Sequence, residues 1–417
     1  MSQKTAEVFG RRWLLHTIRN IPRLASWPTL HHMQGIAAGV PAVIVNAGPS
    51  VDVNAHSLEW ASKRALIFAG NHSLDILDTA GVRPDVVGAI DAGAMVAEHT
   101  RGREAGVLFT APVTHPYVLD GFRHRSWAPA NMGHDDWMWP YPRDVLVPNG
   151  GSVSCTLLIL ARALGCSPII LVGQDLAMTG GRYYPSISGD RGVTVERCMH
   201  EGRPYFFSKY DNGMLHEHGY LLELPGWGGG TVETSIGMHS IHTWFSDMVT
   251  QWDAETPGRF VNATEGGARI AGAREERLAD VLATLPSRDG LRDLLPAWID
   301  AWNGGDAQRA TLRAKLLELR RSMHFARQHS EVASELLRRG NHAALKDCER
   351  ALRKCVAGAE AVIFGLDRRR FYLATQAATE HAKDDAVKKD CAMQFYRMCI
   401  NADILVGPAL QEAADAL

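Results

Sequence analysis

Two short segments of the sequence combine glycine with serine in a way that suits phosphate binding. They are Gly48-Pro49-Ser50 and Gly150-Gly151-Ser152. Glycine lets a ligand approach the backbone closely, and the unpaired N–H groups at the start of a helix attract anions. We therefore predict that both segments contact the phosphate of a nucleotide. Neither has the spacing of a dinucleotide fingerprint or of a P-loop.

Polar residues in two other segments could bind the rest of a nucleotide. Gly173-Gln174-Asp175 and Thr264-Glu265 offer amide, hydroxyl and carboxylate groups that can hydrogen-bond a ribose or a base. Asp91 follows another apolar run, and carboxylates of this kind also bind divalent cations. Asp91 and Asp175 are the credible ligand pair for Mg²⁺, if the chemistry depends on a metal.

A general base is the remaining requirement for transfer to a hydroxyl group. His239 and His242 precede and begin an apolar-periodic segment, where a neutral imidazole could accept a proton from an acceptor hydroxyl. Because the chain has 18 histidines, neither position is singled out by its residue type alone.

The elements that must position these residues are short apolar runs that end in polar residues or glycine. The runs are followed by Asn46, by Gly70 and Asn71, by Asp91 and by Gly173, and they cover residues 42–45, 65–69, 86–90 and 169–172. Segments of helical length separate them, which predicts a Rossmann-like α/β fold with a mainly parallel sheet and helices on both faces. In such sheets ligands bind beyond the carboxyl ends of the strands.

The pattern divides the chain into an N-terminal helical lead-in (1–40), a Rossmann-like nucleotide-sugar-binding domain (41–272) and an all-helical C-terminal region (273–417). Within the second, residues 176–237 are rich in Gly, Tyr and His and predict a loop-rich insertion. Leu312, Leu316 and Leu319 illustrate the helical spacing of the third.

Composition limits the function classes. A net charge of −2 gives no basic field for nucleic acid, and no run of apolar residues is long enough for a membrane span. The seven cysteines include no Cys-x-x-Cys pair, and the first residues lack a leader pattern. These features predict a cytoplasmic protein.

Taken in order, the strand-end segments resemble the motility accessory factor family, which shares a domain with archaeal 6-hydroxymethylpterin diphosphokinases. The most specific parts are Gly173-Gln174-Asp175-Leu176-Ala177 and Asn262-Ala263-Thr264-Glu265-Gly266-Gly267. The resemblance covers about residues 40–272. It implies a sialyltransferase-like domain and transfer of a nonulosonic acid, such as pseudaminic or legionaminic acid, from a CMP-activated donor to Ser/Thr hydroxyls of flagellin.

The resemblance also assigns roles to residues. It implies donor contacts from the following positions: Asn46, Gly48, Pro49, Ser50, Gly70, Asn71, Asp91, Gly150, Gly151, Ser152, Gln174, Asp175, Thr264 and Glu265. The helical region would dock flagellin or a second copy of the chain, giving a homo-oligomer. Two alternatives stay open: an ATP-dependent diphosphokinase acting on a pterin-like alcohol, and a non-catalytic flagellar assembly factor.

Overall fold

The computed structural model describes residues 3–103, 105–128, 150–187, 193–209, 215–366 and 385–417. Its centre is an eight-stranded parallel sheet in the order β13-β12-β6-β1-β2-β3-β4-β5. The strands are β1 (Ala42–Val45), β2 (Leu66–Gly70), β3 (Val86–Ala89), β4 (Val107–Thr110), β5 (His124–Trp127), β6 (Ile169–Val172), β12 (Phe260–Asn262) and β13 (Arg274–Glu275). The predicted Rossmann-like sheet is confirmed.

Helices cover both faces of this sheet, so alternate residues of its strands are buried in two different cores. Val43 and Val45 face one apolar core with α2 (Val51–Asn54), α3 (Leu58–Ser62), α4 (Leu74–Thr79), α5 (Ala94–Thr100), α6 (Pro116–Asp120) and α9 (Leu278–Thr284). Ala42 and Ile44 face the other core with α7 (Val153–Ala163), α8 (Ile236–Glu255) and α10 (Leu291–Ala301). Such two-sided burial explains the continuous apolar runs.

The chain reverses its direction across the sheet between β1 and β6. From β1 it adds β2, β3, β4 and β5 on one side, then returns through α7 to place β6 and β12 on the other. The loop after β1 leads to α2 on one face, and the segment after β6 leads to α8 on the opposite face. This is the topological switch point at which α/β proteins place ligands.

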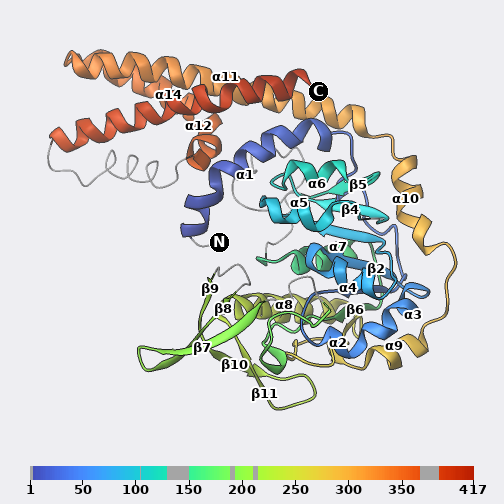
Figure 1. Ribbon diagram of the computed structural model, residues 1–417. Helices are drawn as coiled ribbons and strands as arrows, with labels where there is room; N and C mark the ends of the chain where they lie inside the picture. The colour runs from blue at the N-terminus through green and yellow to red at the C-terminus, as the bar shows by residue number, and fades with distance from the viewer. Residues whose placement is uncertain (1–2, 104, 129–149, 188–192, 210–214, 367–384) are drawn as a thin grey trace.

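The prediction that residues 176–237 are rich in loops was wrong for much of the segment. Two short antiparallel sheets occupy it: β7 (Thr194–His200), β8 (Arg203–Lys209) and β9 (Leu215–Tyr220), then β10 (Leu222–Pro225) with β11 (Thr231–Thr234). Most described side chains in β7 and β8 are exposed or half-buried, and several are charged. These strands therefore contain no continuous apolar run that would identify them in the sequence. We call residues 176–237 the insertion. It projects from the lower end of the molecule in Figure 1.

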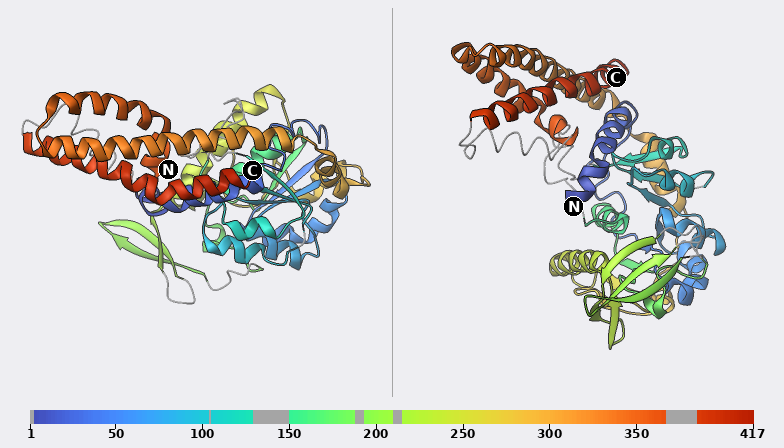
Figure 2. Two further views of the ribbon diagram at one scale, coloured as in Figure 1. Left: turned by 90° about the horizontal axis from the view of Figure 1, so that it is seen from above. Right: turned by 60° about the vertical axis from the view of Figure 1, so that its left-hand side comes forward.

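Within the predicted helical region 273–417, β13 lies in the sheet and α9 and α10 pack on its faces. The described residues from 305 onward form a helical bundle at the opposite end of the molecule (Figures 1 and 2). It comprises α11 (Gly305–Arg338), α12 (His342–Leu366) and α14 (Asp385–Asp415), with α1 (Gln3–Leu24) packed against it. The other side of α1 contacts the loop after β4, where the Asn20 amide donates to the Pro112 and Thr114 carbonyls. No helix among the described residues is long and apolar enough to span a bilayer.

Candidate functional site

The loops after β1 and β6 are held together by one buried carboxylate. Asp175 is 2% exposed. It accepts hydrogen bonds from the backbone N–H of Ser50 (3.1 Å), from the Ser50 hydroxyl (2.6 Å) and from the Thr179 hydroxyl. Burial raises the pKa of Asp175, although these hydrogen bonds act in the opposite direction.

In this arrangement the Ser50 N–H, which was predicted to contact a phosphate, donates to a carboxylate of the protein itself. The carboxylate of Asp175 already occupies the position in which a phosphate would meet the Ser50 N–H. The Gly48 N–H donates to the Gly173 carbonyl at 2.8 Å, and Pro49 supplies the carbonyl that accepts from Asp52 in α2. Because α2 has only four residues, its dipole adds little for a further anion.

The loop after β12 closes over the same carboxylate. The Asp175 carbonyl accepts from the Ala268 N–H at 2.7 Å, and a Cβ on Gly267 would overlap the Asp175 backbone. Glu265 accepts from the Leu278 N–H (3.0 Å), from the Asn54 amide (3.4 Å) and from Arg277. The Glu265 carboxylate thus holds α9 and α2 in place instead of contacting a sugar donor.

We call the loops that follow β12, β6 and β1 the closed half of the carboxyl edge. Three of the predicted donor residues lie there with a polar atom that has no partner among the described residues: Nδ2 of Asn46, Oε1 of Gln174 and Oγ1 of Thr264. All three side chains are at least nine-tenths buried. Because these atoms are buried, a ligand can reach them only if the loops separate.

The start of α7 lies at a different, more open part of the same edge. Ser152 caps this helix, accepting from the Ser154 N–H at 3.3 Å, and Gly151 is exposed with φ of 82°. Gly150 packs against the Trp244 ring, 2.7 Å from where its Cβ would be. An eleven-residue helix with this start presents N–H groups and a positive dipole end to an anion.

The end of β2 meets this helix start directly. A Cβ on Gly70 would lie 2.9 Å from Cγ1 of Val153, the first residue of α7. Asn71 follows Gly70, and its side-chain amide donates to Nδ1 of His99 at 3.0 Å. We call the loops after β2 and β3, together with the first turn of α7, the open half of the edge.

Asp91 lies in the open half and does not share a metal site with Asp175. It is exposed, and its carboxylate accepts from the Gly93 N–H at 2.5 Å. The two aspartates follow β3 and β6, which are three strand spacings apart in the sheet, or on the order of 14 Å. The described residues contain no cluster of three or more His, Cys, Asp or Glu side chains suited to a metal ion. The strand order therefore separates the two aspartates that were predicted to bind Mg²⁺.

The two predicted catalytic histidines lie on the first turns of α8. Their ring centroids are 6.4 Å apart. Nε2 of His242 donates to the Arg269 carbonyl at 2.6 Å, which ties this ring to the loop after β12. No described contact joins His239 or His242 to Asn71 or to Ser152.

Sequence analysis missed the imidazoles of the open half. His72 is exposed and directly follows Asn71, and its ring centroid is 4.6 Å from that of His99. On its other side His72 stacks on Tyr184 from the insertion, with 5.7 Å between centroids. The available signal was the order Gly70-Asn71-His72 at a strand end, which places a titratable group beside a predicted ligand contact.

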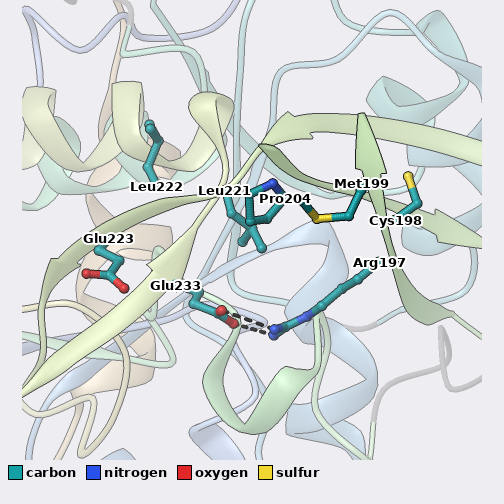
Figure 3. Close-up of a pocket in the computed structure, with 8 residues that line it drawn as sticks. All are labelled: Arg197, Cys198, Met199, Pro204, Leu221, Leu222, Glu223 and Glu233. Carbon is teal, nitrogen blue, oxygen red and sulfur yellow. Dashed lines mark hydrogen bonds and ion pairs between the residues drawn. The ribbon is translucent and has the colours of Figure 1, made fainter. Parts of the chain in front are cut away.

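A separate hollow of about 540 Å³ lies within the insertion (Figure 3). Arg197 and Glu233 form an ion pair along one wall, with 3.0 Å between Nη1 and Oε1. Met199, Pro204 and Leu221 give it apolar sides. None of the residues predicted from the sequence to contact a ligand lines this hollow.

The chain is similar to two kinds of known protein. Residues 15–181 match the family model described as 6-hydroxymethylpterin diphosphokinase MptE-like. The fold is similar to that of the MAf glycosyltransferase of Magnetospirillum magneticum AMB-1, with a TM-score of 0.58 and 16% identity. That match covers 96% of this chain and 62% of the other, so this chain spans less than two thirds of that protein's length.

No curated protein matches the sequence. The family-model match and the structural match confirm the resemblance to motility accessory factors, and the structural match confirms an α/β fold joined to an all-helical C-terminal region.

Proposed function

We propose that this chain is a glycosyltransferase that binds a nucleotide-activated sugar at the open half of the carboxyl edge. One observation carries this proposal: Gly70 at the end of β2 contacts the first residue of α7, and the polar Asn71 directly follows Gly70. The similarity in fold to the MAf glycosyltransferase supports the same class of reaction.

The donor we propose is a CMP-activated nonulosonic acid, and the acceptor is a Ser or Thr hydroxyl of flagellin. As the glycosidic bond breaks, negative charge develops on the departing phosphate. The first turn of α7, at Gly151 and Ser152, would stabilise that charge with N–H groups that are already oriented. Asn71 would bind the nucleotide or the sugar through the end of its amide that does not contact His99.

The diphosphokinase alternative rests on the family-model match to residues 15–181. Pyrophosphate transfer from ATP depends on Mg²⁺ held by acidic side chains. Asp91 and Asp175 follow strands that are on the order of 14 Å apart, which does not favour their sharing one metal ion. The geometry therefore favours the glycosyltransferase.

Two measurements on the purified chain separate the functions. CMP is expected to raise Tm at millimolar concentration, whereas ATP with Mg²⁺ is not, because a ligand stabilises the state that binds it. Incubation with flagellin and CMP-pseudaminic or CMP-legionaminic acid is expected to add one sugar mass per modified site. Stabilisation by ATP with Mg²⁺ alone would favour the diphosphokinase. No response to either nucleotide would favour an assembly factor.

A matched variant shows whether a response to CMP comes from the open half. Asn71→Ala is expected to abolish most of the Tm increase, and His56→Gln, an exposed histidine on the short helix after α2, is expected to leave it unchanged. Equal increases in both variants would place CMP elsewhere on the molecule.

A further inference from the structure

The exposed imidazole of His72 is held in place on two sides by other rings. The His99 ring meets it edge-on, with 4.6 Å between centroids and 68° between planes. The Tyr184 ring stacks on it at 5.7 Å and 17°. A surface side chain usually samples several rotamers, so two ring contacts restrict the directions in which the His72 nitrogens can point.

The contact with Tyr184 depends on the insertion being fastened to the α/β domain. On either side of Tyr184, Arg182 forms an ion pair with Asp52 of α2 (2.6 Å) and the Ser186 N–H donates to the same carboxylate (3.0 Å). Burial raises the pKa of Asp52, but the hydrogen bonds from Ser186 and Arg182 outweigh it and hold the pKa below its usual value. Asp52 therefore stays ionised and keeps Tyr184 beside His72.

His99 fixes two neighbouring residues at once. Besides its contact with the His72 ring, its Nδ1 accepts the amide N–H of Asn71 at 3.0 Å. The acceptor role requires an unprotonated Nδ1. A single ring on α5 thereby sets the orientation of an amide suited to bind a ligand and of an imidazole suited to accept a proton.

The position of His72 relative to the proposed donor phosphate follows from the backbone. Gly70, two residues earlier, contacts the first residue of α7, whose N–H groups would bind that phosphate. His242 lies on α8, where its Nε2 donates to the Arg269 carbonyl. Of these two histidines, His72 is the one that follows the strand end beside α7.

We propose that His72 is the general base of the transfer reaction; this rests on the proposed function. The proton of the acceptor hydroxyl passes to a His72 ring nitrogen while the hydroxyl oxygen forms its bond to the anomeric carbon. The bond between that carbon and the phosphate oxygen breaks, its electron pair stays on the phosphate, and CMP departs. His72 then releases the proton to solvent, to which its side chain is exposed.

His99 and Tyr184 are positioning residues in this mechanism, because they act through the His72 ring. Loss of His99 would leave the imidazole present and poorly aimed. Replacement of His99 by Asn keeps an acceptor for the Asn71 amide and is expected to restore part of the activity that His99→Ala loses.

The test compares the wild-type chain with His72→Gln, His72→Ala, His239→Gln and His56→Gln. Sugar transfer is followed by mass spectrometry and CMP affinity by calorimetry. His72→Gln is expected to lower kcat about 100-fold or more, in the range typical of a lost general base, with KM and CMP affinity changed less than about threefold. Added imidazole is expected to raise the kcat of His72→Ala, and His56→Gln is expected to match the wild type.

Three outcomes overturn the assignment in distinguishable ways. If His72→Gln keeps more than about a fifth of wild-type kcat, or if its loss is wholly in CMP affinity, His72 is not the base. If His239→Gln alone loses kcat while its CMP affinity is unchanged, the base is on α8. If the wild-type chain neither binds CMP nor transfers the sugar, the proposed function fails, and the role of His72 fails with it.

Discussion

The two halves of the carboxyl edge differ in what their polar residues do. In the closed half, the loops after β12, β6 and β1 form hydrogen bonds with one another around Asp175. In the open half, Asn71, His72 and the first turn of α7 face a more exposed edge. The segments that look most specific in the sequence therefore build the scaffold, and a less conspicuous Gly-Asn-His segment carries the groups suited to chemistry.

The largest expected effect is the loss of stability when Gly48 of the closed half, compared with Gly151 of the open half, is replaced by alanine. In Gly48→Ala, the new Cβ would overlap the Asp175 carboxylate and lie 2.5 Å from the Gly173 carbonyl oxygen. We expect a loss of about 3 to 5 kcal/mol in the free energy of unfolding, measured by urea denaturation. In Gly151→Ala no atom of the described residues lies within 4 Å of the new Cβ, and the φ of 82° opposes the change at about 1 to 2 kcal/mol. Equal losses in the two variants would contradict the distinction between the halves.

Asp85 is a second buried carboxylate, and it lies at the amino ends of the strands, whereas Asp175 lies at the carboxyl ends. Asp85 accepts from the Ile67 N–H at 2.7 Å, and burial raises its pKa to about 6 from a usual 3.8. Because the folded state binds this proton more tightly than the unfolded state, stability from Asp85 is full below about pH 4 and is lost as the pH rises through about 6. The loss is about 3 kcal/mol.

The variant Asp85→Asn isolates this contribution. The difference in unfolding free energy between the wild type and Asp85→Asn is expected to change with pH between about 4 and 6 and to be constant above that range. Parallel stability curves for the two proteins across this range would show that burial does not shift the pKa of Asp85.

The smallest expected effect is in the open half, where we expect a substitution to lower CMP affinity without lowering the stability of the fold. His99→Ala removes the acceptor of the Asn71 amide, and we expect CMP affinity to fall about tenfold, or about 1.4 kcal/mol. Calorimetry measures this change, and thermal unfolding without nucleotide is the control. A large loss of stability with unchanged CMP affinity would mean that His99 belongs to the scaffold.

The sequence predicted most of the strands whose residues are buried on both faces, although it missed β4, which is buried at all four positions. Val43 to Val45 and Ile169 to Val172 form apolar runs that end in polar residues, so their loops were expected to meet at one edge. The edge strand β5, His124–Trp127, pairs only with β4 among the described strands and has polar residues, so periodicity does not reveal it. The strands of the insertion were missed for the same reason.

The candidate site was predictable as a location and not as a set of interactions. Strand ends identified Ser50, Asp175 and Thr264 as neighbours, because parallel strands bring their carboxyl ends together. That Asp175 would accept both donors of Ser50 depends on a contact 125 residues away in the chain. Likewise, the ring contact between His72 and Tyr184 depends on how the insertion folds back, which no local pattern specifies.

The crystal structure of the chain with bound CMP tests the difference between the halves most directly. We predict that the phosphate lies at the N-terminus of α7, within hydrogen-bond distance of the backbone at Gly151 or Ser152, with the Asp175–Ser50 hydrogen bonds intact. A phosphate bound to the Ser50 N–H, with the Asp175 carboxylate displaced, would contradict the account.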